Sequence, residues 1–214
     1  MACFITFEGI EGCGKSTQIR LLARRLEGRG HRLTVTREPG GCPVADKIRG
    51  ILLDAENRTM VPMAELLLYA AARAQHVREV VAPALDSGMT VLCDRFTDAT
   101  IAYQGCGRGL DIGTIEDLNR LATAGIRPDL TLLLDCPPET GIGRALARIN
   151  GTEGAREERF ELESLRFHQR VREGYLDLAG REPGRFIIID ASRSIVEMEE
   201  AIVAAVLGRL ENSD

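Results

Sequence analysis

Five short apolar runs are spaced along the chain, and amphipathic stretches separate them. The runs cover residues 3–8, 32–36, 90–93, 130–135 and 185–190. Leu132-Leu133-Leu134 and Ile187-Ile188-Ile189 are apolar without alternation, which is typical of strands with helices on both sides. The pattern predicts an α/β fold with a five-stranded, mostly parallel sheet and helices on both faces.

Polar residues stand at the end of every apolar run. The carboxyl ends of parallel strands meet at one edge of a sheet, and ligands bind there. We therefore expect a single binding rim that contains Glu8, Thr36-Arg37-Glu38, Asp94-Arg95, Asp135 and Asp190.

The first run leads into a glycine-rich loop with the spacing G-x-x-x-x-G-K-S. A helical pattern follows, which is the context of a phosphate-binding loop. Backbone N–H groups and the helix N-terminus are expected to bind phosphate oxygens. Lys15 is expected to reach the β- and γ-phosphates, and Ser16 to ligate Mg²⁺. The residues expected to bind the triphosphate here are Gly9, Ile10, Glu11, Gly12, Cys13, Gly14, Lys15, Ser16 and Thr17.

Two arginines at the rim lie outside this loop. Arg37 follows the second run and Arg95 the third. Guanidinium groups bind anionic groups through paired hydrogen bonds, so the acceptor is expected to be a phosphate itself. Asp94 is a candidate Mg²⁺ ligand beside Ser16. The alternative is that Asp94 and Arg95 form a local ion pair.

Residues 149–158 interrupt the regular pattern with two glycines and four charges. Arg144, Arg148, Arg156 and Arg159 lie in or beside this segment. The composition suits a lid over about residues 148–160 that closes on phosphates and excludes water. The alternative is a solvated loop with incidental charges.

Composition narrows the class of protein further. The 214 residues, 44% hydrophobic, suit one domain over residues 1–214. The net charge of −5 argues against a nucleic-acid binder. Six cysteines without a C-x-x-C pair suit a reducing compartment. With no leader and no long apolar span, we expect a cytoplasmic protein without membrane contact.

Six blocks of residues occur in an order that resembles the thymidylate kinase family, within the nucleoside monophosphate kinases. They are Phe7-Glu8-Gly9-x-Glu11-Gly12-x-Gly14-Lys15-Ser16-Thr17, Arg37-Glu38-Pro39-Gly40-Gly41, Tyr69-x-x-x-Arg73-x-Gln75, Asp94-Arg95-Phe96, Ala102-Tyr103-Gln104-Gly105 and Arg159-Phe160-Glu161. The resemblance implies the phosphate-loop nucleoside monophosphate kinase fold with an arginine-bearing lid. It also implies ATP-dependent phosphorylation of thymidine monophosphate to the diphosphate, which supplies dTTP for DNA synthesis.

The resemblance also implies roles on the acceptor side. Glu11 would bind the sugar 3′-hydroxyl, Tyr69 would stack on thymine and Arg73 would bind its O4. Thr100 and Gln104 would contact the N3 edge, and Tyr103 would crowd the ribose 2′ position. The family usually has serine where this chain has Ala99, so a hydroxyl contact is missing or replaced by water. The implied thymidylate contacts are Glu11, Arg37, Glu38, Pro39, Tyr69, Arg73, Arg95, Thr100, Tyr103 and Gln104. Without the resemblance, Tyr69 would be read as packing and Arg73 as a surface charge.

On the donor side, the resemblance implies that Arg144 stacks on adenine and that Ser192-Arg193 lines its edge. No basic residue lies between Glu11 and Lys15, so the chain is similar to the bacterial type, in which the lid supplies the arginines. Mg²⁺ would lie on Ser16 and Asp94. The residues expected to act in catalysis are Lys15, Asp94, Arg95, Arg148 and Arg159.

Two alternative functions also use a phosphate-binding loop. The same scaffold serves kinases that act on uridylate, cytidylate or shikimate. A GTP-dependent switch would need a guanine-reading Asn-Lys-x-Asp, which the sequence lacks. A helix over residues 62–85 is apolar around much of its circumference, so it is either buried or part of a subunit contact. The resemblance implies a homodimer.

Overall fold

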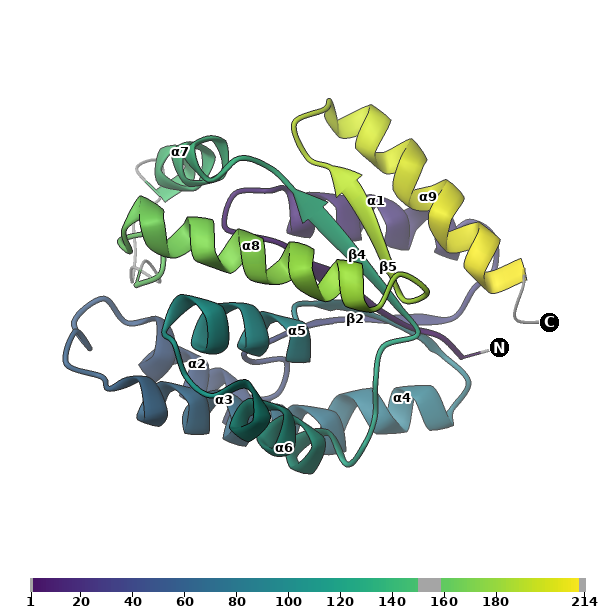
Figure 1. The fold of residues 1–214 in the computed structure, drawn as a ribbon. Coiled ribbons are helices and arrows are strands. Elements are labelled where there is room, and N and C mark those ends of the chain that lie inside the picture. The colour runs from purple at the N-terminus through teal and green to yellow at the C-terminus, as the bar shows by residue number, and fades with distance from the viewer. Residues whose placement is uncertain (1, 150–158, 212–214) are drawn as a thin grey trace.

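The computed structural model describes residues 2–149 and 159–211. Its five strands form one parallel sheet in the order β2-β3-β1-β4-β5 (Figure 1). The strands are β1 (Phe4–Glu8), β2 (Leu33–Arg37), β3 (Thr90–Asp94), β4 (Leu130–Asp135) and β5 (Phe186–Asp190). The predicted strands and their parallel arrangement are therefore confirmed.

The register of the strands brings the polar strand ends together. Phe7 pairs with Asp94 between β1 and β3, and Arg37 pairs with the same Asp94 between β2 and β3. On the other side, Asp135 of β4 pairs with Asp190 of β5. The predicted rim is thus a continuous edge of the sheet.

Helices cover both faces, as predicted. Helix α1 packs against α9 and the sheet, whereas α8 packs against η2, β4 and β5. Figure 1 shows α8 in front of β4 and β5, with α1 behind them. The helical segments are α1 (Lys15–Glu27), α2 (Pro43–Leu53), α3 (Pro62–His76), η1 (Val77–Val81), α4 (Ala82–Asp86), α5 (Thr97–Thr100), η2 (Ile101–Gly107), α6 (Ile112–Thr123), α7 (Pro138–Ile149), α8 (Leu165–Arg181) and α9 (Ile195–Glu211).

The predicted helix over 62–85 is confirmed as α3, η1 and α4 in unbroken succession. Leu66 and Val81 on this stretch are fully buried, whereas Met63 and Leu67 on α3 are exposed. The helix is therefore buried along one side only. Its other side carries apolar residues at the surface.

The core is mainly aliphatic, and it also contains polar side chains. Ile5, Leu22, Leu132 and Ile202 have no exposed surface. Buried charged or titratable side chains include Glu8, Glu38, Glu65, Arg73, His76 and His168. A buried charge is costly without partners. Because burying these groups lowers the stability of the fold, they indicate where a functional site lies.

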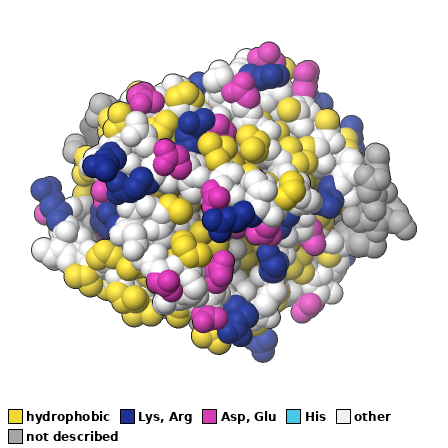
Figure 2. All heavy atoms as spheres, in the orientation of Figure 1, with side chains coloured by type: hydrophobic (Ala, Val, Ile, Leu, Met, Phe, Trp, Pro, Cys, Tyr) yellow, Lys and Arg dark blue, Asp and Glu magenta, His cyan; other side chains and the backbone are white. Residues whose placement is uncertain are grey.

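On the face drawn in Figure 2, acidic and basic side chains are interspersed. In the described part of the chain, no helix combines the length and apolar character needed to cross a bilayer.

Candidate active site

The glycine-rich loop lies in the predicted place, between the end of β1 at Glu8 and the start of α1 at Lys15. Gly9 has a φ of 133° and Gly12 a φ of 70°. Residues with a side chain rarely adopt these backbone angles. A Cβ on Gly9 would collide with the carbonyl oxygen of Leu134, and one on Gly12 with that of Gly141. The loop therefore depends on glycine at both positions to lie against β4 and α7.

Lys15 is folded back onto this loop. Its Nζ donates to the carbonyl oxygens of Gly9 at 3.0 Å and Ile10 at 2.9 Å, and to Cys13 Sγ at 3.4 Å. The side chain is buried. The ammonium group is thus held at the loop that is expected to receive the phosphates.

Ser16 and Asp94 bring two oxygen ligands together from different elements. The Ser16 hydroxyl at the start of α1 donates to Asp94 Oδ2 at the end of β3 across 3.0 Å. Mg²⁺ prefers such oxygens and usually takes one or two from the protein, the rest coming from phosphates and water. Among the described residues, no group of three His, Cys, Asp or Glu side chains is placed to hold a metal. The pair therefore suits Mg²⁺ carried by a triphosphate better than a metal enclosed by protein.

The backbone at Arg95 is held in an unusual conformation. Its φ of 70° lies in the left-handed region, which is uncommon for non-glycine residues and occurs repeatedly at functional sites. Arg95 N donates to Phe7 O at 2.9 Å, and Phe96 N donates to Glu8 Oε1 at 2.7 Å. Both contacts lead to β1, so β1 fixes the turn that follows β3.

The Arg95 guanidinium joins three elements. It donates through NH2 to Glu11 Oε1 at 2.9 Å and through NH1 to the Tyr175 hydroxyl at 3.1 Å. Its Cζ lies 4.8 Å from the centre of the Tyr103 ring. The ion pair that Arg95 forms is with Glu11 of the loop. The side chain is therefore oriented towards the phosphate-binding loop.

Glu11 is surrounded by donors. The Tyr103 hydroxyl lies 2.7 and 2.8 Å from its two oxygens, Arg95 lies 2.9 Å away, and His168 Nδ1 lies 3.3 Å from Oε2. Burial opposes ionisation, but Arg95, His168 and Lys15 together lower the pKa of Glu11 to about 2. The loop carboxylate is therefore ionised throughout the physiological range.

Glu8 has no exposed surface and accepts two hydrogen bonds. It accepts from Phe96 N and, across 2.7 Å, from the Tyr175 hydroxyl. Burial, together with the charge of Asp98, raises the pKa of Glu8 to about 8, although Arg95 opposes the rise. Tyr175 thus lies between Glu8 and Arg95 and links the rim to α8.

Arg37 and Glu38 follow β2 but have different surroundings. Arg37 NH2 pairs with Asp46 Oδ1 at 2.9 Å, and both side chains are about half exposed. Glu38 is buried and bonds to Arg73 Nε and His76 Nδ1. The Pro39 carbonyl accepts from Arg49. Arg37 is thus accessible to an anion, whereas the Glu38 carboxylate is already used within the protein.

Arg73 lies at the centre of a buried polar network, so it is not a surface charge. Its Nε donates to Glu38 and its NH1 to Asn119 Oδ1, both across 2.7 Å. Its NH2 donates to Phe96 O and Thr100 Oγ1, both across 3.0 Å. These bonds use four of the five guanidinium hydrogens. A contact to a base would use the remaining hydrogen on NH1.

The other predicted acceptor contacts lie around this network. Tyr69 is partly buried, and its ring centre is 6.4 Å from that of Phe160. Burial raises the pKa of Tyr69, so its hydroxyl keeps its proton. Gln104 Nε2 donates to Glu65 Oε1 at 2.7 Å. Ala99, where the family usually has serine, is buried.

The two predicted adenine segments are adjacent. Arg144 on α7 donates to the carbonyl oxygen of Ala191 at 3.0 Å. Arg193, two residues further on, is exposed and lies 3.4 Å from Asp190. The structure thus brings α7 and the end of β5 together at the donor end of the rim.

Most of the predicted lid, including Arg156, lies outside the described residues, as does the side chain of Arg148. Arg159 is described and largely buried. It donates through NH1 to Glu65 at 2.6 Å and through Nε to the Leu52 carbonyl at 2.5 Å. Arg159 therefore lies against α2 and α3 here, and it would have to leave these partners to reach a transferring phosphoryl group.

Sequence reasoning missed several buried residues of the site. Glu65 accepts a hydrogen bond from Gln104 and forms ion pairs with Arg108 and Arg159. The pattern of apolar residues in the sequence does not indicate that this glutamate is buried. Glu8 was placed on the rim but given no role. The other missed partners are His76, Asn119, His168 and Tyr175. These residues can be recognised as part of the site only from the fold, which places them against charged partners.

Known proteins resemble this chain in sequence and in fold. A family model described as Thymidylate kinase matches residues 7–202. A thymidylate kinase of Geotalea uraniireducens (strain Rf4) is 69% identical over 210 residues, which is 98% of this chain and 99% of that protein. One of Geobacter sulfurreducens is 62% identical over 210 residues, with the same coverage of both. The crystal structure of thymidylate kinase from Ehrlichia chaffeensis superposes with a TM-score of 0.77 at 30% identity, and covers 96% of this chain and 98% of that one.

Proposed function

The chain belongs to the thymidylate kinase family, and we propose that the rim of its sheet binds the two substrates end to end. It phosphorylates thymidine monophosphate to thymidine diphosphate with ATP as donor, which supplies dTTP for DNA synthesis. The observation that carries the site assignment is the convergence on Glu11 of Arg95 and Tyr103, directly beside the loop that holds Lys15.

In the transfer, an oxygen of the thymidylate phosphate attacks the γ-phosphorus of ATP while the bond to the β–γ bridging oxygen breaks. ADP leaves with that electron pair. The acceptor is already an anion, so no base is needed, and the loose transition state requires alignment and charge neutralisation. Lys15 and Arg95 supply positive charge at the two ends of the migrating group.

The donor nucleotide occupies the phosphate-binding loop. Residues from Gly9 to Thr17 bind its phosphates, and Lys15 exchanges the carbonyls of Gly9 and Ile10 for β- and γ-phosphate oxygens. Arg144 and Arg193 bind the adenine end, which the contact between Arg144 and Ala191 supports.

Ser16 and Asp94 would hold Mg²⁺, and their 3.0 Å separation and oxygen chemistry support this assignment. The ion neutralises charge on the β- and γ-phosphates when it is bound. Asp94 also belongs to the β3 end that positions Arg95, so the two catalytic assignments share one strand terminus.

The acceptor nucleotide lies on the other side of Arg95. Arg37 and Arg95 bind its 5′-phosphate, and Glu11 binds the sugar 3′-hydroxyl. The thymine ring stacks on Tyr69 and is read by Arg73, Thr100 and Gln104. Tyr103 fills the 2′ position, and Glu38 and Pro39 shape the turn. The buried network behind Arg73 supports its role, because a fixed guanidinium discriminates better than a mobile one.

The lid supplies the last positive charges through Arg148 and Arg159. While Arg159 contacts Glu65 and Leu52, its guanidinium is held away from the phosphates. Lid closure then requires that Arg159 exchange Glu65 for the transferring group.

The partner that we propose for the exposed face of α3 is a second copy of this chain. Met63 and Leu67 lie one turn apart on α3, and Leu121 is exposed on α6, which packs against α3. Neighbouring exposed apolar residues mark association surfaces. We place the enzyme in the cytoplasm, since all six cysteines are free thiols.

The substrate assignment is tested by coupled detection of ADP with ATP and a panel of acceptors. Thymidine monophosphate should give turnover far above that of cytidylate, uridylate or shikimate. Equal or faster turnover with one of these acceptors would show that the base pocket has been misidentified.

A further inference from the structure

The guanidinium of Arg95 has partners on both edges and on one face. Glu11 accepts from its NH2 across 2.9 Å, and the Tyr175 hydroxyl accepts from its NH1 across 3.1 Å. The Tyr103 ring covers the face, with 4.8 Å between Cζ and the ring centre. Glu11 and Tyr103 are also proposed to contact the sugar of thymidylate. Of these three partners, Tyr175 alone has no proposed contact with the nucleotide.

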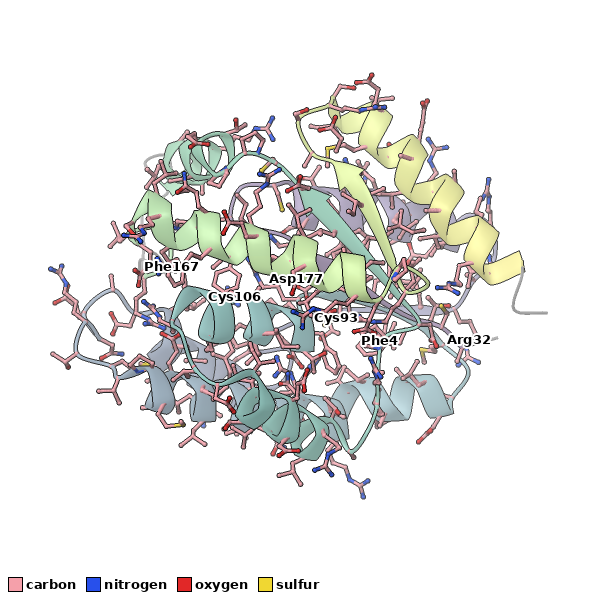
Figure 3. The ribbon with its side chains drawn as sticks, in the orientation of Figure 1. Phe4, Arg32, Cys93, Cys106, Phe167 and Asp177 are labelled. Atoms are coloured by element: carbon pink, nitrogen blue, oxygen red, sulfur yellow. The ribbon has the colours of Figure 1, made fainter. Side chains whose placement is uncertain are left out.

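The place of Tyr175 is set by close packing between α8 and η2. The residue before it, Gly174, lies so near η2 that a Cβ there would be 2.6 Å from Cys106 Sγ. Figure 3 labels Cys106 on η2 and Asp177 on α8, two residues beyond Tyr175. Tyr175 is buried, and its ring centre is 6.2 Å from that of Tyr103 on η2. The helix contact therefore brings both tyrosines to the same guanidinium.

The Tyr175 hydroxyl is fixed in turn by Glu8, at the end of β1. It lies 2.7 Å from Glu8 Oε2, and Glu8 Oε1 accepts from Phe96 N across 2.7 Å. The pKa of Glu8 is about 8, so both forms of the carboxyl group occur near neutral pH. A hydroxyl can donate to the carboxylate or accept from the carboxylic acid, and in either case its oxygen keeps a lone pair for Arg95. Arg95 thus has a fixed acceptor at NH1.

We propose that Tyr175 is a positioning residue, whose hydroxyl holds the guanidinium of Arg95 in one orientation while thymidylate binds at Glu11. The sugar 3′-hydroxyl takes up part of the hydrogen-bonding capacity of Glu11, whereas NH1 of Arg95 keeps its acceptor. A charged group that is already oriented lowers the barrier, because it need not be reorganised when the transition state forms. This role rests on the proposed function, which assigns Arg95 to the migrating phosphoryl group.

The hold on Arg95 is measured on the protein without substrate or any assay of activity. Hydrogen bonds at both NH1 and NH2 slow the rotation of a guanidinium about its Nε–Cζ bond, and ¹⁵N spectra of the arginine Nη atoms report that rate. Arg95→Lys assigns the signal. Tyr175→Phe removes a single oxygen and should make the rotation about tenfold faster, as expected for the loss of one hydrogen bond. An unchanged rate would overturn the proposal and leave the proposed function untouched.

A matched control separates the hydroxyl from the packing around it. Cys106→Ala opens the contact between η2 and α8 without removing the hydroxyl, so the rotation of Arg95 should stay as it is in the unmodified protein. If Cys106→Ala speeds the rotation as much as Tyr175→Phe, packing holds the arginine and the proposal is wrong.

Kinetics show whether this hold serves the reaction. Tyr175→Phe should lower kcat about tenfold and leave KM for ATP unchanged, because it acts on the acceptor side of the site. In the Arg95→Ala background there is no guanidinium to hold, so adding Tyr175→Phe should change kcat less than about twofold. Single-turnover measurements at high enzyme concentration keep the slow variants measurable.

A purely structural residue gives a different pattern. It would lower the melting temperature and reduce kcat by the same factor in both backgrounds, which would contradict the positioning role, as would an unchanged kcat in Tyr175→Phe. If the unmodified protein fails to phosphorylate thymidylate, the proposed function is wrong, whereas the rotation rates still decide whether Tyr175 holds Arg95.

Discussion

The carboxylate of Glu11 accepts a hydrogen bond from the guanidinium of Arg95 across 2.9 Å, although the two residues are 84 positions apart in the chain. Glu11 belongs to the phosphate-binding loop after β1, and Arg95 follows β3. The pair neutralises an acidic group that would otherwise repel a triphosphate. It also holds the guanidinium beside the loop, where we propose that the two substrates meet.

Replacing Lys15 with alanine should remove a preorganised charge from the transition state. By comparison with other lost donors of this kind, we expect a barrier higher by about 3–4 kcal/mol, a fall in turnover of several hundredfold. Steady-state kinetics with ATP and thymidylate measure the change. The sequence has only one other lysine, the exposed Lys47. Lys47→Ala is the matched control and should keep full activity. Near-native turnover of Lys15→Ala would refute the mechanism.

Removal of Arg73 should cost stability as well as substrate recognition. The side chain is 2% exposed and neutralises the buried Glu38. Arg73→Ala leaves that carboxylate without its guanidinium, so the free energy of unfolding should fall by about 3–5 kcal/mol. Urea unfolding measures the change. Arg78→Ala, an exposed position on the following η1, should change stability by less than about 0.5 kcal/mol. If the two variants unfold alike, the network around Arg73 contributes little.

The strands were predictable because most of them are short apolar runs, and those of β4 and β5 are continuous. Residues 130–135 were predicted as a strand and form β4 over Leu130–Asp135. The phosphate-binding loop was equally predictable from the sequence, because its chemistry depends on residues that are close together in the chain and have a fixed spacing. The rim followed from the rule that parallel strands end at one edge.

The buried network could not be predicted in this way. Asn119 on α6 meets Arg73 on α3 across 46 positions, and no periodicity links them. Arg159 was expected at the phosphates but contacts Glu65, because lid position depends on tertiary contacts and substrate rather than on composition. Roles that depend on packing become visible only when the helices are placed.

Glu8 should make stability depend on pH. Its pKa is about 8 in the folded protein against an ordinary value of 4.5. Between these values the folded state holds the proton that the unfolded state has released. The stabilising contribution is therefore complete below about pH 4.5, and the free energy of unfolding falls as pH rises to about 8. Glu11, with its lowered pKa, contributes no slope in this window.

Urea unfolding at about pH 5, 7 and 8.5 tests this assignment. Glu8→Gln keeps the size of the side chain and loses the titration, so its unfolding free energy should decline less over this range than that of the unmodified protein. Equal slopes in the two proteins would contradict the assignment.

The exposed side of α3 should be an interface between copies. Leu67→Glu places a charge at a residue that is 50% exposed in the single chain. The variant should sediment as a monomer where the unmodified protein sediments as a dimer, because burying an unpaired carboxylate is costly. Val196→Glu, at an apolar position on α9 that is 61% exposed, should remain dimeric. If the unmodified protein sediments as a monomer, the proposed interface is contradicted.

The most direct test of two adjoining nucleotide sites is calorimetric titration of the purified protein with thymidine monophosphate, alone and after saturation with a non-hydrolysable ATP analogue. The account predicts heat of binding at one site per chain in both titrations. Uptake of the ATP analogue without measurable heat from thymidine monophosphate would contradict it.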